Sequence, residues 1–303
     1  MASSTNVASI PLVQRDDTLR GIGLAVIATM LFASSDNISK YLSGSLPIIE
    51  FIWIRYALFL GMAAFLNGRR LPATLKPNNP GLQVIRGLCV VGSSVLFVYG
   101  TQSLSIAQAT TISFLSPMLV TILSIPLLGE VVGIRRWAAV GAGLIGMLIV
   151  VRPGLGSFQP AALFCVASST CWAMALIITR KISNSDAAQT TVFWSAGIGA
   201  GLLTVVLPFD FVWPNAWQLG LSLVMGAVAS GGQWLVILAH RQAPASVLAP
   251  FFYAQLLWAT VLGYFIFNNL PDQWGMSGAG IIVASGLYTA HRERVRRRTD
   301  PIR

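Results

Sequence analysis

The residues of this chain that could do chemistry are polar and aromatic side chains within long apolar segments. Polar side chains are costly in lipid, so they tend to face a bundle interior or a cavity. An aromatic cavity with a few hydroxyl and amide groups suits a flat, partly apolar solute. The substrate-binding residues predicted on this ground are Ser34, Asn37, Phe97, Tyr99, Ser168, Trp172, Gln233, Trp234, Tyr253 and Gln255.

Each of these residues also has a structural interpretation. Hydroxyl groups in membrane helices often bond their own helix carbonyls or pack small faces together. For any single serine, this structural role is the stronger hypothesis. Trp and Tyr are common in the belts at membrane surfaces. Trp172, Trp234 and Tyr253 fall deeper than a belt, and binding and packing are equally open for them.

Three residues are candidate hinges. Pro117 lies in the middle of an apolar segment, where it removes a backbone hydrogen bond and can kink a helix. Gly231 and Gly232 are adjacent and directly precede Gln233. Two glycines loosen a helix where a substrate needs close backbone approach. Close helix packing is the alternative for this pair, and slightly the stronger one.

Two charged residues, Asp36 and Arg55, lie within apolar segments at similar depth. An unpaired charge at that depth is expensive, so the sequence predicts an intramembrane ion pair between them. In the alternative, Arg55 binds a substrate carboxylate while Asp36 pairs with Lys40, four residues along the same helix.

Catalytic and metal-binding motifs are missing from the sequence. His240 and His291 fall at the ends of apolar segments, and nothing resembles a zinc-protease motif, a Ser-His-Asp set or an ATP-binding loop. The three cysteines lie in apolar stretches without metal-site spacing. We therefore expect no enzyme, no metal and no cofactor, and no transport driven by the chain's own hydrolysis of ATP.

Composition indicates that membrane-spanning helices position these residues. Of 303 residues, 55% are hydrophobic and 10% are charged, against roughly 25% charged in a soluble domain. A helix needs about 20 apolar residues to cross a bilayer. The pattern predicts an all-α polytopic membrane protein of ten transmembrane helices, at 19–43, 48–67, 83–103, 106–128, 134–151, 159–181, 187–208, 216–240, 245–268 and 274–291.

The basic residues indicate an orientation. With a cytoplasmic N-terminus, most Lys and Arg residues fall in cytoplasmic segments, and the outside loops hold Lys40 and Arg152. The sequence therefore predicts a protein of a bacterial inner membrane with both termini cytoplasmic. Its partners are the lipid bilayer and a small-molecule substrate. The basic residues form no stripe with exposed aromatics, which argues against nucleic acid. A monomer is compatible with this arrangement.

An internal repeat divides the chain. The Gly-rich segment that begins at Trp137 recurs at Trp274, and Phe97 matches Trp234 at the same offset. Two copies of a five-helix unit cross the membrane in opposite senses, because five is odd. The predicted parts are a cytoplasmic tail at 1–18, repeats at 19–151 and 159–291, and a basic tail at 292–303. In such inverted repeats, the transport site lies near the midplane.

With these features the chain resembles the drug/metabolite transporter superfamily, in its ten-helix EamA-type branch. The resemblance rests on the run from Ser116-Pro117 to Leu128-Gly129-Glu130, on the Gly-rich fifth and tenth segments, and on Pro47 to Arg55. Within the branch it looks most like the aromatic amino-acid exporters. The second half departs from the pattern, since Phe267 occupies the position of Glu130.

The resemblance implies alternating access, with outward passage of neutral, aromatic or large amino acids. The lack of a central carboxylate or lysine favours a net-neutral solute and facilitated diffusion, although the resemblance also allows proton exchange. Two alternatives remain. A drug-cation exporter would use a buried acid such as Asp36, and a nucleotide-sugar or organic-phosphate carrier would need central basic residues, of which Arg55 comes nearest.

Overall fold

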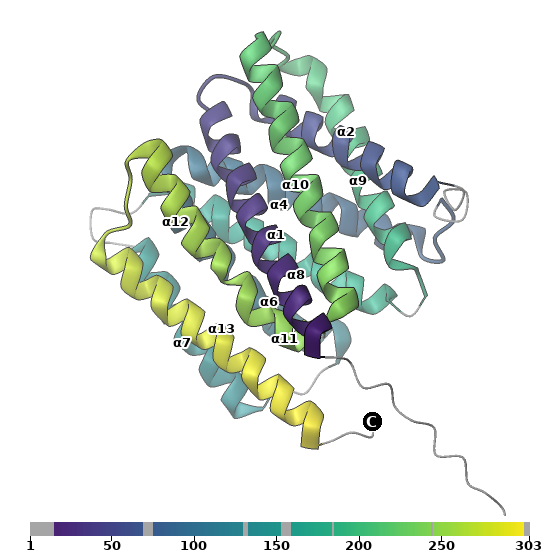
Figure 1. Cartoon of the computed structure of the whole chain (residues 1–303). Helices are drawn as coiled ribbons and strands as arrows, with labels where there is room; N and C mark the ends of the chain where they lie inside the picture. The colour runs from purple at the N-terminus through teal and green to yellow at the C-terminus, as the bar shows by residue number, and fades with distance from the viewer. Residues whose placement is uncertain are drawn as a thin grey trace, which may run out of the picture.

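The computed structural model describes residues 15–68, 75–129, 133–152, 159–183, 185–243 and 245–299, and its regular elements in these ranges are helices (Figure 1). Their bounds are α1 Arg15–Leu42, α2 Ile48–Asn67, α4 Pro80–Ser103, α5 Ile106–Ser113, α6 Ser116–Leu128, α7 Ile134–Val151, α8 Ala161–Ile182, α9 Ala188–Val206, η2 Leu207–Phe209, α10 Ala216–Gln242, α11 Ala245–Phe252, α12 Ala254–Phe267 and α13 Gln273–Thr299.

Eight helical segments in the described part of the chain are long and apolar enough to cross a membrane. They are Thr18–Leu42, Ile48–Leu66, Pro80–Ser103, Ile106–Leu128, Ala161–Ile182, Ala188–Phe209, Ala216–Gln242 and Val247–Phe267. The predicted fifth and tenth spans are α7, whose apolar part Trp137–Val151 is shorter, and α13. Helix α13 continues past the predicted end at 291, because its Arg-rich sequence consists of good helix formers.

Two of the predicted spans are each broken into two helices. Phe114 and Leu115 separate α5 from α6, and Tyr253 separates α11 from α12. Pro117 is the second residue of α6, a position where its missing N–H costs little. Irregular backbone at membrane depth is tolerated where protein or a cavity surrounds it. The two breaks therefore mark the interior of the bundle.

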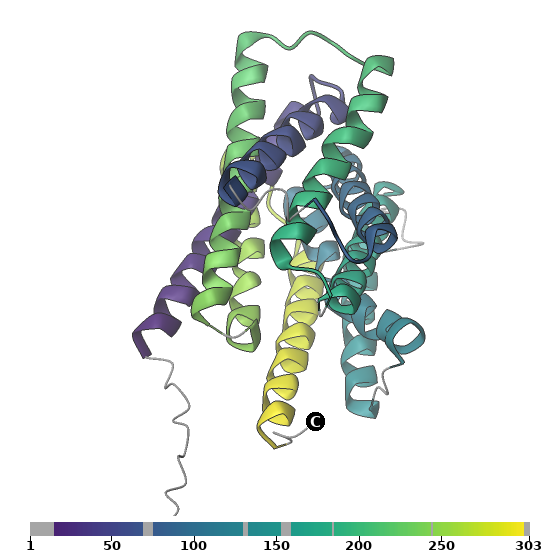
Figure 2. The ribbon, with the colours of Figure 1, turned by 90° about the vertical axis from the view of Figure 1, so that its right-hand side faces the viewer.

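The helices pack in matched pairs (Figures 1 and 2). Helix α1 lies along α10 as α4 lies along α8, and α1 contacts α12 as α8 contacts α6. Helix α10 contacts α2 as α4 contacts α9. The two remaining large contacts join α2 to α9 and α7 to α13. Each of these large contacts is thus reproduced, or maps onto itself, when the first five predicted spans are exchanged for the last five.

Helices α7 and α13 approach each other closely along one margin of the molecule (Figure 1). A Cβ atom on Gly278 would lie 2.6 Å from the carbonyl oxygen of Gly146, and one on Gly146 would lie 2.9 Å from that of Gly278. Ser285 Oγ donates a hydrogen bond to the Ala139 carbonyl at 2.6 Å. Gly278, one of the recurring glycines of the sequence repeat, therefore meets Gly146 at this contact, where a side chain on either would clash.

A polar cluster ties the start of α9 to the start of α4. Asp186 accepts hydrogen bonds from the backbone N–H of Asn78 at 2.7 Å and from Gln83 Nε2 at 2.8 Å. Asn78 and Asn79 donate their side-chain amides to Ser185. We call these five residues the Asp186 cluster. It joins the loop that precedes α9 to the loop that follows α2.

A second polar cluster occupies the opposite end of the α2–α9 pair. Glu50, in the first turn of α2, accepts a hydrogen bond from the backbone N–H of Val212 at 3.3 Å. Gln218 Nε2, in the first turn of α10, donates to the Ser45 carbonyl at 3.4 Å. We call these four residues the Glu50 cluster. It joins the first turn of α2 to the loop that follows α9, so it repeats the Asp186 cluster in the other half of the chain.

Candidate substrate-transport site

A carboxylate and an amide meet between α1 and α12. Gln255 Nε2 donates a hydrogen bond to Asp36 Oδ2 at 3.2 Å. Asp36 lies in the C-terminal half of α1 and is half-buried, and Gln255 is the second residue of α12, close after the break at Tyr253. The broken helix thus brings an amide side chain to a carboxylate that lies within a membrane-spanning segment.

A guanidinium and two hydroxyls meet between α2 and α4. Arg55 Nη2 donates to Ser94 Oγ at 2.6 Å, and Tyr56 Oη lies 3.0 Å from the same oxygen. The Arg55 guanidinium also lies 5.5 Å from the centroid of the Tyr56 ring. Arg55 is half-buried, as Asp36 is. Its hydrogen-bond partner is a neutral hydroxyl rather than a carboxylate.

Asp36 and Arg55 attract each other electrostatically. In the described part of the chain, however, each has a neutral hydrogen-bond partner in place of direct contact with the other, and the direct ion pair is Arg152 with Asp272. The predicted pairing of Asp36 with Arg55 therefore stays a prediction. Lys40, the alternative partner of Asp36, donates instead to the Leu104 carbonyl.

The two helix breaks carry aromatic rings that touch. The ring of Phe114, between α5 and α6, lies 4.6 Å from the ring of Tyr253, between α11 and α12. Tyr253 packs on α13, where a Cβ atom on Gly286 would overlap its hydroxyl. Because Tyr253 is two residues before Gln255, the aromatic pair lies next to the Asp36–Gln255 contact along the chain.

Other predicted site residues take structural partners. Ser34 Oγ donates to its own helix carbonyl at Met30, at 2.9 Å. Ser168 Oγ donates to the Ser93 carbonyl at 2.7 Å and so ties α8 to α4. Asn37 is buried and donates to the Ala33 carbonyl at 2.8 Å, while its Oδ1 atom has no hydrogen-bond partner among the described residues.

The predicted aromatic residues are dispersed. Phe97 is partly buried and packs against two hydrophobic clusters of the core. Tyr99 is 40% exposed and contacts Phe164, with 5.9 Å between ring centroids, and Trp172 is 41% exposed on α8. Gln233 and Trp234 are half-buried on α10. Among the predicted aromatic residues, Tyr253 contacts another ring at a helix break in the described part of the chain.

The candidate hinges differ in their surroundings. Pro117 is the second residue after the break between α5 and α6. Gly231 and Gly232 lie within a continuous α10, and a Cβ atom on Gly232 would lie 3.0 Å from the Phe32 ring. The geometry at Gly232 is that of helix packing, and a hinge role stays a prediction. Glu130, the acid of the family pattern, lies outside the residues that the structure describes.

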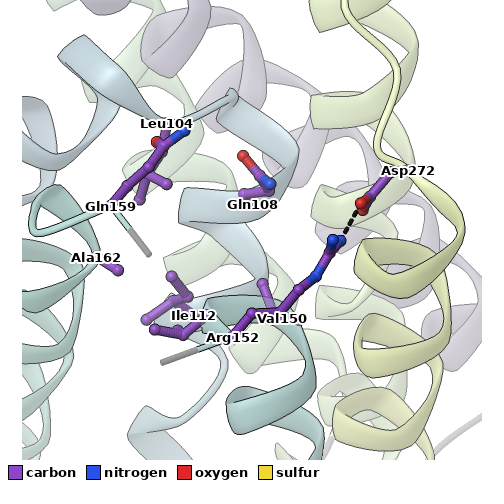
Figure 3. A pocket seen from close by; sticks show the side chains of 9 residues that line it. Leu104, Gln108, Ile112, Val150, Arg152, Gln159, Ala162 and Asp272 are labelled. Atoms are coloured by element: carbon purple, nitrogen blue, oxygen red, sulfur yellow. Dashed lines mark hydrogen bonds and ion pairs between the residues drawn. The ribbon is translucent and has the colours of Figure 1, made fainter. Parts of the chain in front are cut away.

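Two hollows lie near the ends of α1, α4, α7 and α12. One of about 210 Å³ is lined by Leu104, Gln108, Ile112, Val150, Val151, Arg152, Gln159, Ala162 and Asp272. Figure 3 shows the side chains of Arg152 and Asp272 pointing toward each other across this hollow. The hydrogen bonds from Arg152 and from the Gly275 backbone hold the pKa of Asp272 below its usual range.

The second hollow, of about 300 Å³, is lined by Lys40, Tyr41, Ser43, Gly44, Gln102 and Phe267. Lys40 Nζ lies 2.5 Å from the Leu104 carbonyl oxygen and 5.3 Å from the centre of the Phe267 ring. Because Leu104 lines the first hollow, Lys40 stands between the two. The second hollow lies at the C-terminal end of α1, beyond Asp36 along that helix.

Sequence interpretation missed Phe114, Ser94 as the partner of Arg55, and the helix breaks themselves. The available signal for the breaks was the proline content: Pro117 follows the first break and Pro250 precedes the second. A helix-breaking residue near the middle of two corresponding spans is the sequence pointer to a transport site in inverted repeats.

Comparison with known proteins decides the family. The model of the EamA-like transporter family matches residues 19–152 and again 159–289. The chain belongs to the EamA-like transporter family. It is therefore an integral membrane transporter, and the relatives of this transporter are transporters rather than enzymes.

Three curated relatives of this transporter differ in their solutes. The S-adenosylmethionine uptake transporter of Rickettsia felis is 28% identical over 91% of this chain and 94% of its own. The riboflavin transporter of Vibrio cholerae is 27% identical, with 93% and 96% covered. The pseudopaline exporter of Pseudomonas aeruginosa is 24% identical, with 90% and 97% covered. None of these three is an aromatic amino-acid exporter.

The fold is shared with solved structures, one of which is described only as the crystal structure of a protein. It superposes with a TM-score of 0.62 at 16% identity, and the alignment covers 93% of this chain and 99% of that one.

Proposed function

We propose that this transporter carries solutes of amino-acid type that bear a flat aromatic part, by alternating access between two inverted five-helix repeats. The observation that carries the proposal is the contact of Phe114 with Tyr253 at the two helix breaks, next to the Asp36–Gln255 hydrogen bond. Apolar rings beside polar groups within a bundle are the features of a site for such a solute.

The repeat architecture has two supports. The packing contacts are matched between the halves, and the family model matches each half once. In the proposal, α7 and α13 are the fifth and tenth membrane helices, and both termini are cytoplasmic. Rocking of one repeat against the other would expose the broken helices α5–α6 and α11–α12 to each side in turn.

The solute class follows from what the site offers and from what the relatives carry. The Rickettsia relative is named as a transporter of S-adenosylmethionine, which is an amino acid joined to a nucleoside with an adenine ring. The Vibrio relative is named as a transporter of riboflavin, which carries a flat ring system. Aromatic amino acids share both the amino-acid group and a flat ring. The first solutes to test are therefore S-adenosylmethionine and tryptophan.

Counterflow in proteoliposomes tests the proposal. Radiolabelled S-adenosylmethionine, tryptophan, riboflavin and a drug cation are compared, and at least one of the first two should exchange across the membrane. Tyr253→Ala and Phe114→Ala should each slow that exchange a few-fold to about tenfold, since an aromatic contact is worth roughly 0.5–1.5 kcal/mol.

Tyr264→Ala is the matched control, because Tyr264 is an exposed ring on the same helix α12 and contacts its neighbour Phe265. It should leave exchange unchanged. Movement of the drug cation without either amino-acid solute would contradict the substrate class. It would favour instead an exporter of cations that uses the Asp36 carboxylate.

A further inference from the structure

We propose that Asp36 and Arg55 form a clamp for a zwitterion, in which Asp36 receives the cationic amino group of the solute and Arg55 receives its carboxylate. The inference rests on the proposed function and narrows it, because it requires both charged groups of an amino acid. Three features support it. The hydrogen-bond partners of Asp36 and Arg55 are neutral, the two residues lie on different helices, and the nearby cation Lys40 binds the Leu104 carbonyl instead of Asp36.

The first feature is the partners. Asp36 receives a hydrogen bond at 3.2 Å from the neutral amide of Gln255, and Arg55 gives one at 2.6 Å to the neutral hydroxyl of Ser94. Charges within a membrane span are costly unless a charged partner or a function retains them. Neither partner neutralises the charge that it contacts. Each charged group therefore keeps capacity for an ion of opposite sign.

The second feature is the placement. Asp36 projects from α1 and Arg55 from α2, and the two attract each other without direct contact in the described structure. Both side chains are half-buried rather than sealed in the core. An amino-acid group carries its opposite charges on two groups bonded to the same carbon, and in the proposal it lies between the two side chains and contacts both. Charge-assisted hydrogen bonds of this kind are stronger than neutral ones.

The third feature is Lys40. It lies one turn beyond Asp36 on α1 and would compete for the carboxylate as an internal partner. Its Nζ atom is instead held at 2.5 Å from the Leu104 carbonyl oxygen, and it lies over the Phe267 ring. Asp36 is thus left open to a cation from the solute.

The aromatic part of the solute then has a defined neighbour. Gln255 joins the clamp to Tyr253, two residues earlier, and Tyr253 contacts Phe114. A solute held by its amino and carboxylate groups at Asp36 and Arg55 would direct its ring toward this aromatic pair. The clamp therefore selects the amino-acid group, and the rings select the flat part.

Competition against uptake of radiolabelled S-adenosylmethionine and tryptophan tests the clamp. The competitors are unlabelled tryptophan, tryptamine, which lacks the carboxylate, and indole-3-propionate, which lacks the amine. The unsubstituted protein should prefer tryptophan to both. Arg55→Gln should reduce the preference over tryptamine about tenfold, and Asp36→Asn the preference over indole-3-propionate by a similar factor, since each loses a hydrogen bond to a charged group.

Two further variants keep both charges and repeat the test. Gln255→Leu removes the hydrogen-bond partner of Asp36 and should change only the preference for tryptophan over indole-3-propionate, which lacks the amine. Ser94→Ala removes the partner of Arg55 and should change only the preference for tryptophan over tryptamine, which lacks the carboxylate. Glu50→Gln is the control, because Glu50 is a carboxylate of α2 whose recorded hydrogen bond is with Val212. It should leave both preferences intact.

The outcomes separate the hypotheses. Folded variants that keep the original ranking of competitors would overturn the clamp, and so would equal loss of both preferences in every variant. If the single replacements fail to fold and the double replacement folds, Asp36 and Arg55 are a structural ion pair and the clamp is wrong. If the unsubstituted protein takes up neither radiolabelled solute, the proposed function itself fails.

Discussion

The two polar clusters at the ends of the α2–α9 pair hold equivalent parts of the chain with unequal strength. Asp186 accepts two hydrogen bonds shorter than 2.9 Å, from Asn78 and Gln83. Glu50 is buried, accepts one bond at 3.3 Å from Val212, and keeps its Oε1 atom without a partner among the described residues. Corresponding ends of the helix pair thus carry a satisfied carboxylate in one half and an under-satisfied one in the other.

The difference arises from what the neighbouring glutamines do. Gln218 forms a capping box with Asn215, so its side chain is engaged at the start of α10, and its amide reaches Ser45 only at 3.4 Å. Gln83 takes no part in a capping box, because the N-cap residue Asn79 makes no side-chain hydrogen bond to α4. The Gln83 amide is therefore available to donate to Asp186. An end with weaker bonds opens at a lower free-energy cost. We therefore expect the Glu50 end to open more readily.

Asp186→Ala should show the largest effect. The change leaves the backbone N–H of Asn78 and the amide of Gln83 without their acceptor, and hydrogen bonds to charged groups contribute roughly 1.5–3 kcal/mol. The thermal unfolding midpoint in detergent should fall accordingly. Asp210→Asn is the control, because Asp210 is exposed and should tolerate the change. An equal fall in both variants would show that the cluster has no special role.

Gln83→Leu should have a smaller effect in the same direction. Leucine keeps the volume of this buried side chain but removes the donor to Asp186 and to Thr191. Asp186 retains the backbone donor of Asn78, so a loss of roughly 1 kcal/mol is expected. Combining Gln83→Leu with Asp186→Ala should lower the unfolding midpoint by less than the sum of the two, since both remove the same bond. Full additivity would contradict the contact.

Acid should weaken the Asp186 cluster by protonating the Asp186 carboxylate. Burial raises the pKa of Asp186, but the hydrogen bonds from Gln83 and Asn78 together outweigh it and hold the pKa below its usual value of 3.8. A depressed pKa contributes stability above the unfolded value, and this stability is lost as the pH falls below about 3.8. Unfolding midpoints of the unsubstituted protein and Asp186→Asn should converge in that range. A constant gap at all pH values would contradict the assignment.

Glu50→Gln should show the smallest effect. The replacement removes a buried charge that has one long hydrogen bond, and it keeps an oxygen for Val212. Release of the desolvated charge offsets the weaker acceptor, so the unfolding free energy should change by less than about 0.5 kcal/mol. A loss as large as that of Asp186→Ala would show that the two ends are held equally, and the comparison would fail.

The sequence predicted the site in part. Asp36, Arg55, Tyr253 and Gln255 were recognisable as candidates because charged and large polar residues are rare in apolar segments. Tyr253 and Gln255 lie at or beside a helix break, whereas Asp36 and Arg55 lie within the continuous helices α1 and α2. Ser34 and Ser168 could not be sorted in this way, since a serine in a span serves packing as readily as binding. The exposed positions of Tyr99 and Trp172 follow from helix rotation, which depth along the chain does not specify.

The composition and the length of the apolar segments by themselves determined that this is a helical membrane protein, because apolar segments of this length have few other stable states. The recurrence of the Gly-rich segment at Trp137 and Trp274 also predicted a repeat, but it did not predict that α7 packs against α13. Only the tertiary structure decided that two spans are broken, that Phe114 reaches Tyr253, and that Asp36 contacts Gln255 rather than Lys40. These contacts join residues far apart in sequence, and they depend on how each helix rotates against its neighbours, which local pattern does not encode.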